Sequence, residues 1–215
     1  MSPDGEKRSA PSGKGKGAGT MQKQPEVTAA TRKKIIDAFW TIYKEKPIDK
    51  ISIAEISRIT GNNRGTFYHY FKDVYAVLDQ IEDDLMNQVT AEVKEILSDH
   101  LFEEAARDIN ALYSITIPIF KKHGEKIFTL LGKNGDPKFT SRFRESSRAL
   151  LIQFWNLSDQ TEHLDYLIEY TYSVMIGLMA KWYENGNDLT DDEFFKMAQG
   201  LIANGVLGYL KKQAG

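Results

Sequence analysis

Hydrophobic residues after Pro25 recur at steps of three and four, which is the pattern of helices with one apolar face. The first such stretch carries this stripe: Ile35, Ile36, Phe39, Trp40, Ile42 and Tyr43. Thr28 is placed to cap the helix, and Pro47 should end it, because a residue before proline avoids the helical region. The folded part of the chain is therefore expected to open with an amphipathic helix.

Two short helices separated by a tight turn are predicted next. Ser52 and Glu55 have the spacing of a capping box, in which the serine side chain accepts from the amide of Glu55 and the glutamate reaches back to the serine amide. The helix opened by this box should place three isoleucines on one side: Ile53, Ile56 and Ile59. Gly61 should stop it, and Asn63 can cap a second helix that runs to about Phe71.

Longer helical patterns fill the rest of the chain. They predict helices over about 74–97, 102–121, 125–131, 137–156, 161–184 and 191–211. One break is expected at His123-Gly124, and Pro118 should kink or break its helix. We find neither the alternating pattern of strands nor an internal repeat, so the sequence predicts an all-α fold.

Composition and charge divide the chain. Residues 1–25 hold three of the six prolines and five of the sixteen glycines, and this stretch cannot bury enough apolar surface to fold. It is expected to be a disordered tail, either inert or a basic arm on DNA phosphates. Through Lys72 there are 14 basic and 7 acidic residues, a balance of +7, and afterwards 14 and 23, a balance of −9. A polyanionic partner would therefore meet the N-terminal third.

The second short helix has the side chains of a helix that reads the major groove of DNA. At about 100° per residue, Phe67 and Phe71 fall on one side and Gly65 and His69 on the other. Gly65 would let the helix approach the bases closely. Phosphates would be contacted by hydroxyl groups and cations on Ser52, Thr66, Tyr68, Arg64 and Lys72. A solvated surface helix is the alternative that this pattern leaves open.

The order of residues over about 28–78 resembles the TetR family of transcriptional regulators. The shared features are a basic start to the first helix, a hydroxyl residue capping the second, Arg-Gly-Thr with a tyrosine two residues on, and a Phe-Lys-Asp exit. They lie in the segments Thr31–Ala38, Ser52–Thr60 and Gly61–Asp73. The resemblance implies three parts: a disordered tail at 1–25, a helix-turn-helix DNA-binding domain at 26–73, and a helical effector-binding and dimerisation domain at 74–215.

The resemblance also implies which residues contact DNA. The matching positions are Ser52, Arg64, Gly65, Thr66, Tyr68 and Lys72. His69 joins them by its place opposite the phenylalanines, Asn62 by its place in the turn, and Tyr70 as a partner of Lys72 in a phosphate clamp. Two positions depart from the family pattern. The histidine stands one place earlier than in many members, and Val74 stands where a second lysine is frequent.

For the C-terminal part the resemblance is architectural. The segment 166–182 is apolar around much of its circumference, and the last helix carries Phe194, Phe195, Met197, Leu201, Ile202, Val206 and Leu207. We expect these two helices to form a four-helix dimer interface matched to a palindromic operator, with an ordinary monomeric core as the alternative. Aromatic residues are candidates for an effector pocket, or for core: Tyr113, Phe120, Phe128, Phe154, Trp155, Tyr166 and Tyr170.

Other chemistry finds little support in the sequence. The chain has no cysteine, no Gly-rich phosphate loop, no nucleophile elbow and no histidine pair at four-residue spacing, so we expect no enzyme, no cofactor and no metal. The acidic stretch 185–193 lacks calcium-loop spacing, and Thr190 with Glu193 fits a capping box better. No apolar run approaches the roughly 18 residues of a membrane helix, and no secretory signal is seen.

The sequence thus predicts a repressor that binds double-stranded DNA as a homodimer and is released by a small-molecule effector. It would work in the cytoplasm, at the nucleoid when bound, without membrane contact. An alternative is a regulator controlled by a protein partner, or an activator without a ligand. A helical enzyme is the remote alternative.

Overall fold

The computed structural model describes residues 23–98 and 109–213, and within them all regular structure is helical. The elements in order are α1 (Lys23–Tyr43), η1 (Ile48–Lys50), α2 (Ile53–Thr60), α3 (Arg64–Tyr70), α4 (Val74–Leu97), α6 (Ile109–Leu131), α7 (Pro137–Phe154), α8 (Leu164–Glu184) and α9 (Asp191–Gln213). The predicted all-α fold is confirmed. None of the described helices combines the length and the apolar character that a membrane span requires.

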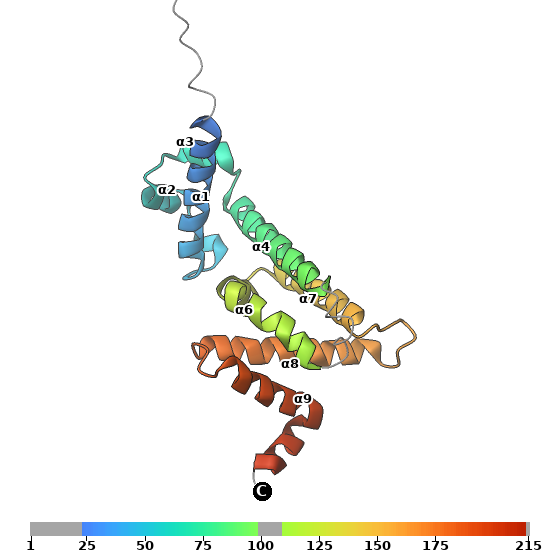
Figure 1. The fold of residues 1–215 in the computed structure, drawn as a ribbon. Helices are drawn as coiled ribbons and strands as arrows, with labels where there is room; N and C mark the ends of the chain where they lie inside the picture. Colours follow the sequence, from blue (N-terminus) through green and yellow to red (C-terminus); the bar gives the residue numbers. More distant parts are fainter. Residues whose placement is uncertain (1–22, 99–108, 214–215) are drawn as a thin grey trace, which may run out of the picture.

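Helices α1, α2 and α3 form a small unit at one end of the molecule (Figure 1). Its centre is made by buried side chains that face one another from the three helices and from the start of α4: Ile35, Phe39, Ile56, Phe67 and Val77. The unit is closed below by Tyr43, whose ring stacks on Phe39 at 5.5 Å between centroids. This core holds the two short helices at fixed positions on the surface.

Two details of this unit differ from the sequence predictions. Helix α1 begins at Lys23, so Thr28 lies inside it and is not its cap; Pro25 falls in the first turn, where a missing N–H leaves no bond unmade. Ile59 is 51% exposed while Ile56 is fully buried. Steps of three residues drift by about 60° each around a helix, so Ile59 has rotated away from the side that Ile56 buries.

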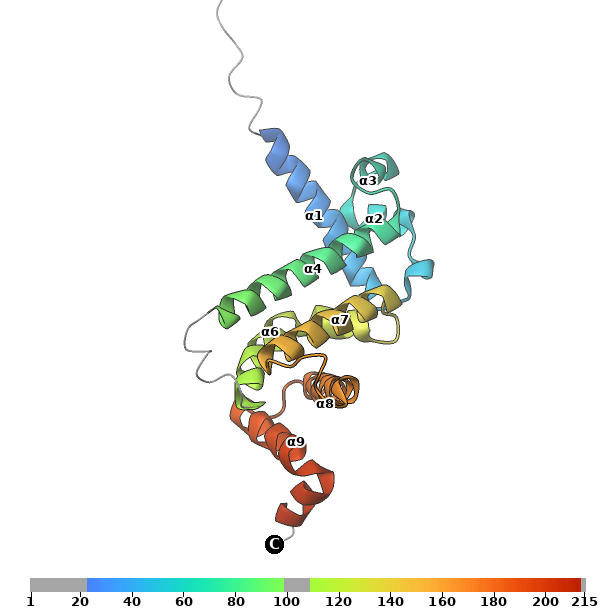
Figure 2. The same cartoon turned by 90° about the vertical axis from the view of Figure 1, so that its right-hand side faces the viewer.

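Helix α4 leads from this unit along the rest of the molecule. Figure 2 shows α4 above α6 and α7, with α8 crossing beneath them and α9 below. Because α4 packs against α1 at one end and against α6 farther on, it belongs to both halves. The predicted domain boundary between residues 73 and 74 therefore stays a prediction. The first part of the helix predicted over 102–121, residues 102–108, lies outside the described part.

Helix α6 is continuous, so the predicted break at His123-Gly124 is wrong. Gly124 is buried, and a Cβ added there would lie 3.3 Å from Cδ2 of Tyr183 on α8. This glycine therefore permits close packing of two helices and does not end one. The helix also runs through the exposed Pro118 without a break.

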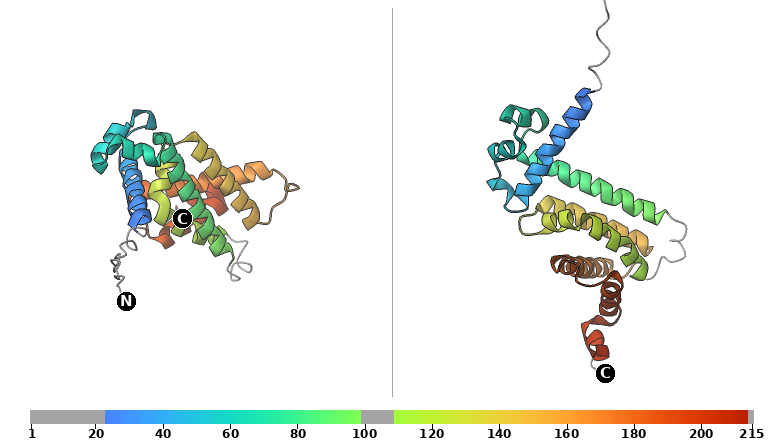
Figure 3. Two further views of the ribbon diagram at one scale, coloured as in Figure 1. Left: turned by 90° about the horizontal axis from the view of Figure 1, so that it is seen from above. Right: turned by 60° about the vertical axis from the view of Figure 1, so that its left-hand side comes forward.

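The last helices agree with prediction within a few residues. Thr190 and Glu193 form the predicted capping box before α9: the amide of Glu193 donates to Thr190 Oγ1 at 3.3 Å, and Thr190 N donates to Glu193 Oε2 at 2.9 Å. Helix α9 is interrupted at Gly205, where φ is 64° and ψ is 172°. Figure 3 shows α9 extending away from the body of the molecule. The side chains of Val206 and Leu207 lie outside the described part.

Candidate nucleic-acid interface

The two short helices are fixed by local caps at their facing ends. Ser52 Oγ accepts from the amide of Glu55 at 3.2 Å, and Asn63 Oδ1 accepts from the amide of Thr66 at 2.8 Å. Between them, Gly61 takes a left-handed conformation with φ of 70°. Both predicted caps are confirmed. The second bond of the capping box, from the amide of Ser52 to the carboxylate of Glu55, is not formed between these two described residues, because this carboxylate pairs with Lys46 at 2.7 Å. The turn geometry is thus set by residues close in sequence.

The inner side of α3 is anchored by aromatic rings. Phe67 is 1% exposed and Phe71, just after the helix, is 5% exposed. The guanidinium of Arg32 on α1 lies 5.1 Å from the centre of the Phe71 ring and donates to Gln80 on α4 at 2.7 Å. These contacts connect the exit of α3 to two long helices, so α3 has little freedom to rotate.

The outer side of α3 carries the exposed side chains that the sequence predicted. Arg64, Gly65, Tyr68 and His69 all face solvent, with Tyr68 58% exposed. An exposed tyrosine of this size on a seven-residue helix contributes little to the core, so its surroundings are available to a partner. A side chain at Gly65 would crowd the cap, since its Cβ would lie 3.2 Å from Asn63 Oδ1.

The other predicted contact residues have mixed surroundings. Thr66 is half-buried and its hydroxyl donates to Asn63 Oδ1 at 3.2 Å, so it completes the cap. Tyr70 and Asn62 are half-buried, whereas Ser52 is exposed and keeps its hydroxyl hydrogen free to donate. Lys72 is exposed and lies 3.7 Å from Asp73. The structure thus brings the nine residues to one end of the molecule, and their contact with DNA stays a prediction.

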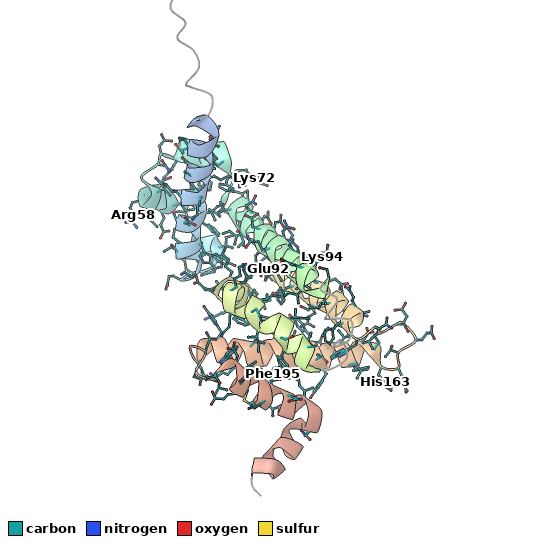
Figure 4. All side chains as sticks on the ribbon, in the orientation of Figure 1. Arg58, Lys72, Glu92, Lys94, His163 and Phe195 are labelled. Carbon is teal, nitrogen blue, oxygen red and sulfur yellow. The ribbon has the colours of Figure 1, made fainter. Side chains whose placement is uncertain are left out.

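Several cations on α1, α2 and α3 are not committed to carboxylates. Arg58, Arg64 and Lys34 are exposed and form no ion pair with another described residue. By contrast, Lys33 and Lys46 are paired with Asp37 and Glu55 at 2.6 and 2.7 Å. Figure 4 shows Arg58 on α2 and Lys72 before α4 at opposite edges of this unit. The uncommitted Arg58 at one edge and the exposed Lys72 at the other favour a polyanion lying across α3.

Sequence reasoning missed one candidate beside Val74. Val74 is buried, so it could not hold a phosphate in place of the family's frequent lysine. The next residue, Tyr75, is 53% exposed in the first turn of α4, and its hydroxyl can donate. A helical wheel of α4 with Val74, Val77 and Leu78 inward would have placed Tyr75 outward.

Helix α1 ties this unit to α6 and to the turn after it. Trp40 Nε1 and Lys44 Nζ both reach Glu125 on α6, each at 3.1 Å, and Tyr43 Oη donates to the carbonyl of Asn134 at 2.9 Å. The hydrogen bond from Lys44, with that from Trp40, holds the pKa of Glu125 below its usual value. The position of α1 therefore depends on the position of α6.

A buried carboxyl group lies nearby on α4. Glu82 is fully buried, and neither carboxylate oxygen has a hydrogen-bond partner among the described residues. Arg142 on α7 approaches only to 4.0 Å and is already bonded to Asp83 at 2.7 Å. Burial, with the carboxylate of Asp136 as the second cause, raises the pKa of Glu82 to about 7. The carboxyl group of Glu82 therefore changes its protonation state near neutral pH.

A cavity of about 250 Å³ lies between α4, α6, α7 and α8. It is lined by Met86, Val89, Thr90, Val93, Lys94, Leu97, Thr116, Ile119, Phe120, Phe143, Ser146, Ser147, Ala149, Leu150, Gln153 and Met175. Most of these side chains are apolar. A concave apolar site with a few polar groups is typical of small-molecule binding.

The aromatic residues predicted for an effector pocket are dispersed. Phe120 lines this cavity. Phe128 is not among the lining residues, but its ring stacks on the ring of Phe120, with 5.4 Å between the centroids. Tyr113 and Phe154 lie in the core, and Trp155 is partly buried against it. Tyr166 and Tyr170 are exposed on the outer side of α8. Whether any of them contacts an effector stays a prediction.

The outer side of α8 exposes large apolar side chains. Tyr166, Leu167 and Tyr170 are 79%, 49% and 52% exposed. Gly177, two turns farther on, has open space around it. On the opposite side, Trp182 stacks on Phe194 of α9 at 4.3 Å. The described residues hold no group of three metal-ligating side chains.

Comparison with known proteins gives consistent relatives. Residues 107–204 match the family described as "Transcriptional regulator C-terminal region", of the TetR type. The uncharacterized HTH-type transcriptional regulator YvdT of Bacillus subtilis (strain 168) is 30% identical over 103 residues, which are 48% of this chain and 52% of that protein. The chain thus matches about half the length of this curated relative.

Solved structures share the fold at low sequence identity. A TetR transcriptional regulator from Streptococcus agalactiae 2603V has a TM-score of 0.58 at 21% identity, with 83% of this chain and 97% of that chain covered. NalD, the secondary repressor of the MexAB-OprM multidrug efflux pump in Pseudomonas aeruginosa, has 0.60 at 17%, covering 84% and 97%. FadR from Bacillus subtilis in complex with stearoyl-CoA has 0.55 at 15%, covering 81% and 98%.

Proposed function

Because the chain belongs to the TetR family of transcriptional regulators, a family of non-enzymatic proteins, we propose that it is a DNA-binding repressor released by a small-molecule effector. The observation that carries the proposal is the outer side of α3. A capped seven-residue helix buries Phe67 and presents Arg64, Tyr68 and His69 outward beside uncommitted cations. This is the geometry of a helix that enters the major groove. Such a regulator works in the cytoplasm, where it meets its operator.

The proposal includes a homodimer. The exposed Tyr166, Leu167 and Tyr170 on α8 form an apolar surface larger than a solvated helix needs. A two-fold interface of α8 and α9 would cover this surface and give two copies of α3 for a palindromic site. Tyr170→Asp should convert the dimer to a monomer in light scattering, with unchanged helicity. A wild-type protein that is monomeric at all concentrations would contradict the dimer.

Operator binding is tested with fragments selected from the source genome. Affinity should fall steeply with salt, because cations released from phosphates drive binding. Lys72→Ala should weaken binding and reduce the salt slope by about 1. Tyr68→Ala should weaken it about tenfold or more, while far-UV circular dichroism keeps the wild-type helicity. Lys133→Ala, in the exposed turn after α6, is the matched control and should leave affinity unchanged. Failure to select any fragment would reject the proposal.

The cavity between α4 and α8 is the proposed effector site. It lies on the helix that also reaches the DNA-binding unit, and α6, which lines it, holds α1 through Glu125. An occupant that shifts α6 would therefore move α1 and lower operator affinity. The test is release of labelled operator by ligands that raise the melting temperature of the protein. Ligands that bind without changing operator affinity would favour control by a protein partner.

A further inference from the structure

The cavity between α4, α6, α7 and α8 is asymmetric in charge. Lys94 is its one charged lining residue among the described part of the chain, and no carboxylate lines it. Its polar groups are otherwise hydroxyls and one amide, on Thr90, Thr116, Ser146, Ser147 and Gln153. An occupant with a positive charge would find no counter-ion here and would be repelled by Lys94.

Two hydroxyls of the cavity lining, on Thr116 and Ser147, are already used within their own helices. Thr116 Oγ1 donates to the carbonyl of Leu112 at 3.0 Å, and Ser147 Oγ donates to that of Phe143 at 2.9 Å. Neither hydrogen is free for a ligand without breaking these bonds. The surrounding walls, which include Phe120, Phe143 and Met175, are buried and apolar. The inner part of the site therefore suits a hydrocarbon group.

Lys94 is at the opposite extreme. It is exposed in the last turn of α4 and has no ion pair with another described residue. Glu92, two positions earlier, cannot neutralise it, because Glu92 is held by Lys122 at 2.6 Å and His123 at 3.1 Å on α6. Figure 4 labels Lys94 and Glu92 near the same end of α4. Among the described residues, therefore, no carboxylate neutralises this ammonium at the edge of the apolar cavity.

From this arrangement we infer that the cavity takes an amphipathic anion, with an apolar chain inside and one acidic group at Lys94. The inference rests on the proposed effector site and adds the chemical class of its ligand. The ion pair at a water-accessible edge leaves the chain to supply most of the affinity through burial. The acidic group is either a carboxylate or a phosphate at the end of the chain, and both pair with an ammonium.

The test compares ligands of one chain length and different charge on the purified full chain without DNA. Decanoate, 1-decanol and decyltrimethylammonium are titrated by calorimetry below the concentrations at which they form micelles. Decanoate should bind about threefold to fivefold more tightly than decanol, and the ammonium more weakly than decanol. Decanol binding as tightly as decanoate, or the cation binding best, would overturn the inference. Decyl phosphate, as a further arm, shows whether the phosphate or the carboxylate binds more tightly.

Two variants locate the ligand. Lys94→Met should reduce decanoate to the affinity of decanol, whereas the control Lys133→Met should keep the difference between decanoate and decanol. Val93→Trp fills the cavity and should abolish binding of acid and alcohol alike. Retained discrimination in Lys94→Met would overturn the inference, as would absence of binding by all three ligands. The titration contains no DNA, so it tests the class of ligand separately from operator release. Decanoate that binds tightly here, but does not release labelled operator in the separate assay, supports this inference and rejects the proposed function.

Discussion

The two candidate sites of this molecule are built in opposite ways. The surface around α3 is exposed and largely polar, and its residues lie within the contiguous segment from Ser52 to Tyr75. The cavity is concave and apolar, and its residues come from four helices between Met86 and Met175. The first is fixed by caps and by the buried rings of Phe67 and Phe71, and the second by the packing of long helices against one another. The α3 surface should therefore behave as a rigid part, while the cavity can change shape when α6 moves.

The largest effect is expected from removing the anchor of the rigid part. Phe67→Ala leaves a hole beneath α3 and should lower the free energy of unfolding by about 3–5 kcal/mol. Urea unfolding followed by circular dichroism measures it. A loss below about 1 kcal/mol would mean that α3 is not held by its ring, and the contrast between a rigid and an adaptable site would fail.

The next effect concerns the buried carboxyl group of α4. Burial raises the pKa of Glu82 from 4.5 to about 7, so the neutral form is favoured in the folded state. The destabilisation is absent below pH 4.5, grows as pH rises towards 7, and is complete above it. Glu82→Gln should therefore gain up to about 3 kcal/mol relative to wild type between pH 4.5 and 8. Urea titrations at both pH values measure this gain. If the stability difference between Glu82→Gln and wild type is the same at both pH values, the carboxylate is solvated.

A smaller effect is expected where α6 meets α8. Gly124→Val places two methyl groups against Tyr183 and should cost about 1–3 kcal/mol by overpacking. Thermal unfolding measures the cost. Valine favours a helix more than glycine does, so its propensity alone would stabilise α6 and a net loss reports overpacking. Unchanged or raised stability would mean that α6 and α8 separate easily, which would make the cavity more adaptable than its packing indicates.

The smallest effect is expected from the cap of α3. Asn63→Ala removes the acceptor for the amide of Thr66 and should cost about 1 kcal/mol. Asn63→Asp keeps an acceptor and should retain most of the stability. Operator affinity should fall with Asn63→Ala as well, because α3 begins to fray. Equal stability of the alanine and aspartate variants would show that the cap is dispensable.

Local signals explain which features could be predicted from the sequence. The caps at Ser52, Asn63 and Thr190 need only neighbours three residues away, and all three are present. The role of Gly124 depends on Tyr183 of another helix, so its sequence context indicated a break that does not exist. The places of the seven aromatic residues also depend on how helices far apart in sequence pack, so the sequence could not show that they lie in different parts of the molecule. A helical wheel identifies an apolar side but not whether that side meets a neighbour or a void.

The carboxylate of Glu125 holds two side chains of α1, Trp40 and Lys44, on the helix that also lines the cavity. If an occupant of the cavity weakens DNA binding through this connection, thermodynamic reciprocity requires DNA to weaken the occupant by the same factor. A promoter would then act as an antagonist of its own inducer. The concentration at which the protein responds would rise with the number of operators in the cell.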